Sequence, residues 1–250
     1  MPQVDDIVIV TVVVLVALAP MTASFLQCWA DRARVNPGNG LPKGRSSCDS
    51  CDTTLAAVDL VPILSWLWRR GRARCCNAVL HPSLLYAELL ILVVSIWGVL
   101  VVPLSLAIPT LILASGLQAV VLLTGPEPKA ARGFAAFLTV MALIVVGTMF
   151  EDRLIPHAGA TLLGLAIWLA ARLQRTLATD ALFLLLPAGA LTGFVGLAWT
   201  GFLAIPAGLA YRALKPMIYP KDLRRPVMPG EAVVFGLAAA LWVVWLYLVI

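Results

Sequence analysis

The chain has 250 residues, of which 61% are hydrophobic and only 12% are charged, and its mean hydropathy is +0.96. Soluble domains contain roughly half apolar and a quarter charged residues, so this composition excludes an ordinary soluble protein. The net charge of +5 does not indicate a nucleic-acid partner, because the cationic residues are distributed between apolar stretches as in a membrane protein.

Eight apolar stretches predict an all-α polytopic membrane protein, since about 20 apolar residues suffice to cross a hydrocarbon core of roughly 30 Å. The expected transmembrane helices lie near residues 7–29, 83–101, 107–124, 134–150, 157–174, 181–197, 199–214 and 231–250. The first stretch follows an acidic segment, MPQVDD, and is too long for the apolar core of a signal peptide. We therefore expect it to be retained as a span.

Positive charge is distributed unequally between the connecting loops. If the N-terminus lies outside, every Lys and Arg except Arg153 falls in a cytoplasmic loop, at 30–82, 125–133, 172–180 or 212–229. This distribution follows the positive-inside rule. We expect a bacterial inner-membrane protein with both termini periplasmic and the loop 30–82 cytoplasmic.

The chain divides into two expected parts. Residues 1–101 contain two spans and, between them, a small cytoplasmic domain that carries four of the five cysteines. Residues 102–250 contain six spans with short loops. Cys28 lies at the end of the first span, where a packing role is expected. The sequence shows no convincing internal repeat.

An apolar segment within the small domain is typical of the membrane surface. Residues 61–68 are apolar and include Trp66 and Trp68, and Arg69 and Arg70 follow directly. Indole rings favour the headgroup level, and arginines there attract anionic lipid. Anionic membrane lipid is therefore an expected partner.

Paired cysteines at both ends of the small domain predict a metal site. Cytoplasmic cysteines rarely form disulfides, and thiolates spaced as in Cys48-x-x-Cys51 can chelate zinc with Zn–S distances near 2.3 Å. The second pair, Cys75 and Cys76, is adjacent, and adjacent side chains are expected to point apart. His81 is therefore an alternative to Cys75 as the fourth ligand. Structural zinc and metal-free thiols, reduced or redox-active, are both open at this point.

Few acidic residues occur in the membrane half, and ionisable groups there mark functional sites by default. Glu127 follows the third span and Asp180 opens the sixth, so both are expected at the cytoplasmic surface. Two facing carboxylates can share a proton and activate water, as in aspartic proteases. The alternatives are a helix N-cap for Asp180, which follows Thr179, and a solvated loop charge for Glu127.

The N-terminal part resembles the prepilin peptidases, the type IV leader peptidase family of membrane aspartic proteases. Residues 23–26 (ASFL) are similar to the opening motif of that family. Residues 59–67 (DLVPILSWL) and the following 71–72 are similar to its central motif, and Pro82 and Glu88 match a proline and a glutamate that enter the next span.

The cysteines match the same family with one displacement. The family has two C-x-x-C pairs around the central motif, and Cys48, Cys51 and Cys76 fall on three of the four positions. The third family cysteine falls on Ala73, whereas Cys75 is additional.

Over the membrane half the resemblance is weaker. One catalytic aspartate of the family ends a span, and its position falls on Thr124. The second closes a Gly-x-Gly-Asp motif, and Asp180 falls on it, although Leu177 and Thr179 replace the glycines. Glu127, three residues beyond Thr124, is the expected replacement for the missing carboxylate.

The resemblance implies cleavage of the leader of type IV prepilins or pseudopilins at the cytoplasmic face, in pilus assembly or type II secretion. It also implies methylation of the new N-terminus by S-adenosylmethionine, tied to the N-terminal part. Because Thr124 cannot ionise, an active enzyme is one of two hypotheses. The other is an inactive relative that binds pilin-like helices or partners an active paralogue.

Overall fold

The computed structural model describes residues 2–35, 44–48, 50–80, 82–174, 182–218 and 231–249. Within these ranges the chain is almost entirely helical, and seven helices are long and apolar enough to cross a membrane. The only strand-like pairings in the described ranges are two isolated β-bridges. The predicted architecture, an all-α polytopic membrane protein, is confirmed.

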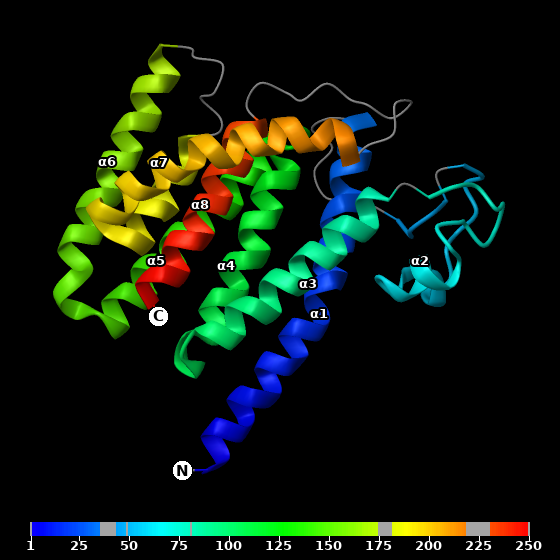
Figure 1. The fold of residues 1–250 in the computed structure, drawn as a ribbon, viewed down its shortest axis with the longest axis horizontal. Helices are drawn as coiled ribbons and strands as arrows, with labels where there is room; N and C mark the ends of the chain where they lie inside the picture. Colours follow the sequence, from blue (N-terminus) through cyan, green and yellow to red (C-terminus); the bar gives the residue numbers. More distant parts are fainter. Residues whose placement is uncertain are drawn as a thin grey trace.

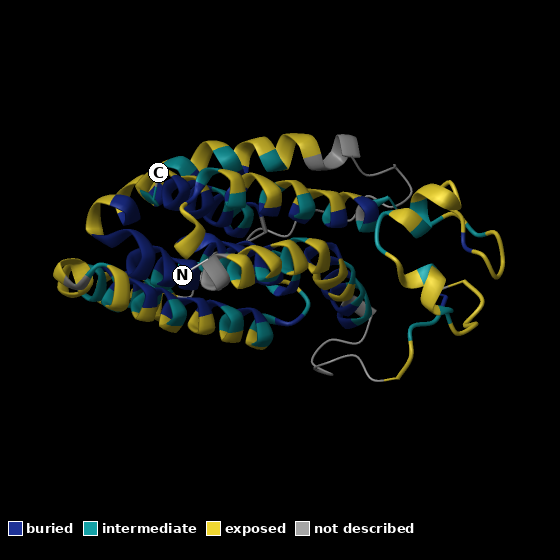
Figure 2. Ribbon diagram, turned by 90° about the horizontal axis from the view of Figure 1, so that it is seen from below, coloured by how far each residue is buried: buried dark blue, intermediate teal, exposed yellow. Residues whose placement is uncertain are grey.

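The first two long helices flank a small domain. α1 (Pro2–Val35) packs against α3 (Ser83–Val101), and the described residues between them, 44–48 and 50–80, form what we call the cysteine domain. This domain contains a short 3-10 helix, η1 (Ala57–Leu60), and the one-turn helix α2 (Leu64–Trp68). Figures 1 and 2 both show it beside α1 and α3, on the side away from α6.

The remaining helices form a larger bundle. They are α4 (Leu104–Leu123), α5 (Pro128–Met149), η2 (Glu151–Arg153), α6 (Leu154–Leu173), η3 (Leu182–Leu184), α7 (Leu185–Ile218) and α8 (Glu231–Val249). α8 lies against α7 and α4. The Trp245 indole of α8 donates to the Thr110 hydroxyl of α4 at 3.1 Å, and both side chains are buried. This bond satisfies a polar pair that has no water partner inside the bundle.

One helix takes the place of two expected spans. We expected spans at 181–197 and 199–214, whereas α7 runs through both ranges and is broken at Gly193, where φ is 63° and ψ is −165°. Residues 182–192 extend roughly 16 Å, which is too short to cross a hydrocarbon core of about 30 Å. The described residues therefore contain seven long helices, one fewer than the number of expected spans. Because the two limbs of α7 are joined without a polar loop, the sequence does not reveal the position of the break.

The first limb of α7 runs antiparallel to α6. A Cβ added at Gly164 would meet the Leu185 carbonyl, and one added at Gly189 would meet the backbone of Ala160. Figure 1 places the C-terminus on the same side of the bundle as the N-terminus and the α3–α4 turn. The first limb of α7 therefore returns the chain alongside α6 before the second limb begins at the break.

The break in α7 is stabilised by a histidine of α6. The His157 Nδ1 atom lies 3.0 Å from the Ala190 carbonyl oxygen, which precedes the break. Carbonyls released by a break in hydrocarbon have no water to bind, so a side-chain partner is needed. A Cβ added at Gly193 would lie 3.2 Å from the His157 ring. Gly193 is therefore required both by its backbone conformation and by its packing.

We expect Gly193→Ala to lower the midpoint of thermal unfolding in detergent. Alanine would have to adopt a conformation that is essentially restricted to glycine, at a cost of about 1–3 kcal/mol. Gly201→Ala in the same helix is the matched control, because a Cβ there meets nothing within 4 Å. Equal unfolding midpoints for the two variants would contradict this account of the break.

Candidate metal centre

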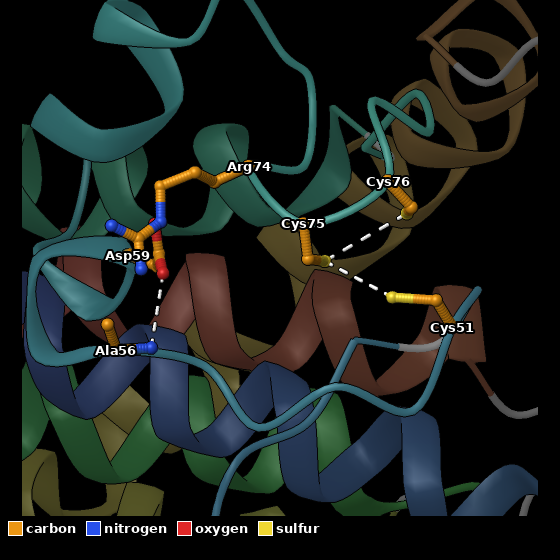
Figure 3. A network of polar contacts seen from close by, with 6 residues as sticks. All are labelled: Cys51, Ala56, Asp59, Arg74, Cys75 and Cys76. Atoms are coloured by element: carbon orange, nitrogen blue, oxygen red, sulfur yellow. Dashed lines mark hydrogen bonds and ion pairs between the residues drawn. The ribbon is translucent and has the colours of Figure 1, made fainter.

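Four cysteine side chains converge in the cysteine domain. The Sγ atoms of Cys48, Cys51, Cys75 and Cys76 all lie within 4.8 Å of one another. The Sγ–Sγ distance is 3.3 Å for Cys51–Cys75, 3.7 Å for Cys48–Cys76 and 3.9 Å for Cys75–Cys76. These distances exceed the roughly 2.05 Å of a disulfide, so the thiols are free. Figure 3 shows Cys75 with its sulfur directed toward Cys51 and Cys76.

The spacing of these sulfur atoms fits a tetrahedral metal ion. Four ligands at 2.3 Å from a central zinc lie about 3.8 Å from one another. The observed distances of 3.3 to 3.9 Å bracket this value closely. Thiolate sets of this geometry favour zinc or an iron–sulfur centre over harder ions. The four cysteines predicted from the sequence can therefore hold a metal together; His81, the alternative ligand, lies outside the described residues.

Two equivalent turns, 25 residues apart, present the four thiols. Each turn is closed by the same pair of backbone hydrogen bonds. These bonds are Cys48 N–Thr53 O (3.0 Å) and Asp52 N–Cys48 O (2.9 Å) in the first turn, and Ala73 N–Ala78 O (2.8 Å) and Asn77 N–Ala73 O (2.9 Å) in the second. Asp52 and Asn77 have positive φ angles of 54° and 59°, which these residue types tolerate better than most. The cysteine domain is thus an internal repeat that sequence reading missed.

This equivalence explains the unusual second pair of cysteines. Ala73 occupies the position of Cys48, and Cys75 occupies the position of Ser50. The ligand that is missing at Ala73 is therefore replaced from within the same turn, two residues further on. The expectation that Cys75 and Cys76 point apart is wrong, because the tight turn brings both sulfur atoms into the cluster.

An ion pair joins the second turn to the middle of the domain. Arg74 Nε lies 3.3 Å from Asp59 Oδ1, and Asp59 Oδ2 accepts a hydrogen bond from the Ala56 N–H at 3.1 Å (Figure 3). Because Arg74 directly precedes Cys75, this pair fixes the second turn against η1. Nothing in the sequence indicated this pairing, although Asp59 begins the central motif.

The thiols are electrostatically unequal. Side-chain and backbone hydrogen bonds with Thr53, followed by the hydrogen bond with Cys75, lower the pKa of Cys51 to about 6. The hydrogen bond to Cys51, followed by that to Cys48, raises the pKa of Cys75 to about 12. Cys51 is therefore the thiolate at neutral pH, the form that ligates metals.

One buried carboxylate ties the cysteine domain to the membrane helices. Glu88 of α3, 2% exposed, accepts a hydrogen bond from the Ile63 N–H at 2.6 Å and another from the Ser24 side chain of α1. Ile63 has φ 62° and ψ −55°, and the Leu64 N–H donates to the Pro62 carbonyl at 2.5 Å. This is a γ-turn of the rare, strained hand, which is especially unfavourable for a β-branched residue. The carboxylate therefore holds a strained backbone in place.

The predicted catalytic positions have different environments. Glu127 begins α5 and is only 5% exposed, so the alternative of a solvated loop charge is wrong. Thr124 ends α4, and its hydroxyl donates to the Val120 carbonyl of its own helix at 2.6 Å. Asp180 lies outside the described residues, and its pairing with Glu127 stays a prediction.

Comparison with known proteins assigns the N-terminal part. The sequence model of the bacterial peptidase A24 N-terminal domain matches residues 17–102, which include α1, the cysteine domain and α3. Prepilin leader peptidase/N-methyltransferases from Dickeya chrysanthemi and Aeromonas hydrophila are 38% identical over 73 and 60 residues, covering 25% and 24% of this chain. The protein of that name from Pectobacterium carotovorum is 53% identical over 32 residues, or 13% of this chain. No solved structure matches.

The match defines the class of the N-terminal part, a membrane helix pair around a four-cysteine domain. Residues 17–102 are similar to the N-terminal domain of bacterial A24 peptidases and to part of the prepilin leader peptidase/N-methyltransferases. The similarity spans only 25% of the length of the Dickeya protein, 21% of the Aeromonas protein and 12% of the Pectobacterium protein.

We expect Glu88→Ala to loosen the cysteine domain, because the Ile63 N–H would lose its acceptor and the strained turn its restraint. An unsatisfied buried group costs about 1–3 kcal/mol. Limited trypsin digestion of the protein in detergent measures this, since Arg69, Arg70 and Arg72 are exposed cleavage sites. Glu88→Gln keeps an acceptor and is the matched control. If both variants were cut at the wild-type rate, the bond would not restrain the domain.

Proposed function

We propose that this protein is a membrane aspartic endopeptidase that removes the leader of type IV prepilins or pseudopilins. The observation that carries the proposal is the burial of the Glu127 carboxylate at the α4–α5 junction, three residues beyond the position of the family's first catalytic aspartate. Burying a carboxylate at the start of a helix inside a membrane bundle costs free energy, so such a residue usually has a function. The names of the relatives and the A24 domain support the same reaction class.

The proposed chemistry uses Glu127 and Asp180 as a pair. One ionised carboxylate takes a proton from water as the water oxygen attacks the scissile carbonyl, while the other, protonated, donates to the carbonyl oxygen. Collapse of the tetrahedral intermediate then breaks the C–N bond, and the leaving amine takes a proton from the pair. Thr124 takes no part in proton transfer, because a hydroxyl bonded to its own helix does not ionise.

The cysteine domain supports this activity in the proposal. Zinc bound by the four cysteines would be structural, because all four tetrahedral positions are filled by protein ligands. The names of the relatives include N-methyltransferase. A methyl transfer from S-adenosylmethionine to the new N-terminus would also belong to this part. We place the domain on the cytoplasmic side of the bacterial inner membrane, with both termini periplasmic, on the basis of the loop charges.

A cleavage assay tests the peptidase. Purified protein in lipid is incubated with a prepilin from the same genome, and the loss of the leader mass is followed by mass spectrometry. We expect cleavage by the wild type and a fall of at least about 10³-fold in Glu127→Gln and in Asp180→Asn, because members of a catalytic unit fail together. Thr124→Val should retain activity.

The same assay distinguishes an active peptidase from the alternative, an inactive relative that binds pilin-like helices. Absence of cleavage by the wild type, with the same substrate cut by a family member that keeps both aspartates, would establish that alternative. A methyl increment on a pre-cut substrate without cleavage would assign chemistry to the cysteine domain alone.

Metal content tests the zinc site. We expect about one zinc per chain by elemental mass spectrometry, and its loss in Cys75→Ser, because three thiolates leave one tetrahedral position without its protein ligand. Ala73→Cys combined with Cys75→Ser should restore zinc, since Ala73 is equivalent to Cys48 in the repeated turn. Cys28→Ser, outside the cluster, is the control. Full zinc content in Cys75→Ser alone would show that Cys75 is not a ligand.

A further inference from the structure

The helix α2 and the residues before it present an apolar face outward. Leu64, Leu67 and Trp68 are 65%, 55% and 85% exposed. They are spaced i, i+3, i+4, so they lie on one face of the helical turn. Three further exposed apolar side chains precede the helix: Val58, Leu60 and Val61. We call these six residues the α2 face. A soluble surface rarely gathers this many apolar side chains without a partner.

The orientation of the α2 face is fixed from inside the domain. Trp66 points the other way: a Cβ added at Gly71 would lie 2.8 Å from its ring, and Gly71 has a positive φ of 70°. The first turn of α2 begins at Ile63, which Glu88 of α3 holds by a hydrogen bond of 2.6 Å. Trp68 therefore points outward for two reasons. Trp66 packs against Gly71 on the inner side of α2, and the hydrogen bond between Glu88 and Ile63 fixes the start of the helix.

Positive charge borders the α2 face. Arg69 and Arg70 follow Trp68 directly, and both are exposed. Exposed apolar residues followed by arginines match the two layers of a bilayer surface, acyl chains and anionic headgroups.

The α2 face stands beside helices that lipid must cover. Figures 1 and 2 show α2 standing to the side of α1 and α3 rather than beyond the end of the bundle. The outer surface of α3 is itself apolar, with Leu90 54% and Val93 61% exposed. Helices α1 and α3 are long and apolar enough to cross the membrane, so the acyl chains around them reach the side on which α2 stands.

We propose that the α2 face is immersed in the headgroup and upper acyl region of the bilayer, with Arg69 and Arg70 contacting anionic lipid phosphates. α2 would then act as a third membrane attachment of the cysteine domain, beside its covalent links to α1 and α3. This interaction is independent of peptidase activity and of metal binding.

Photocrosslinking in the full-length protein tests the proposal. Benzoylphenylalanine is placed at Trp68, and the protein is irradiated in nanodiscs of phosphatidylcholine and phosphatidylglycerol. We expect lipid adducts by mass spectrometry at position 68. The matched control carries the same group at Ser50, which is exposed on the cysteine turn. We expect few lipid adducts there.

The charge requirement is tested in the same assay. Arg69→Gln with Arg70→Gln should reduce the preference for phosphatidylglycerol adducts, by about fivefold for each arginine removed. Arg69→Lys with Arg70→Lys keeps the charge and should keep the preference. An equal lipid yield at positions 68 and 50 would overturn the proposal. Adducts only to a second copy of the chain would also overturn it.

Discussion

The hydrogen bond between the Glu88 carboxylate and the Ile63 N–H is the contact on which the arrangement of the N-terminal part depends. It joins a membrane helix to a strained γ-turn, and the direction of α2 follows from that turn. The same carboxylate is bonded to Ser24 of α1, so both spans and the domain between them meet at one buried group. Removing the Glu88 side chain would leave the Ile63 N–H and the Ser24 hydroxyl without this acceptor, so the three elements would lose a shared contact.

The backbone departs from regular structure in two places, and at each place other parts of the protein satisfy the disturbed polar groups. In the cysteine domain, positive φ angles at Asp52 and Asn77 curl two equivalent turns so that four sulfur atoms meet. In the membrane, the backbone of Gly193 reverses the chain, and His157 bonds the Ala190 carbonyl beside it. In both places the polar backbone groups disturbed by the break are satisfied within the protein, as hydrocarbon and close packing require.

Much of the fold was predictable because membrane spans can be recognised in a sequence by their length and hydropathy. The sequence did not reveal that α7 continues through two expected spans, because no charged residue marks a loop near the break at Gly193. The cysteine cluster was predictable from residue type and spacing, but the convergence of Cys75 and Cys76 depends on turn geometry. The burial of Glu127 could not be predicted from the sequence either, because a carboxylate beside two prolines is equally typical of an exposed loop.

In the repeated turn, a metal-binding cysteine can change its position in the sequence and still reach the cluster. A side chain two residues further along the second turn still reaches the centre, so the ligand set can drift in sequence while its geometry persists. A search that demands two C-x-x-C pairs would reject this chain, although its four sulfur atoms all lie within 4.8 Å of one another. Divergent relatives of this kind are better sought by a conserved spatial pattern than by a fixed cysteine spacing.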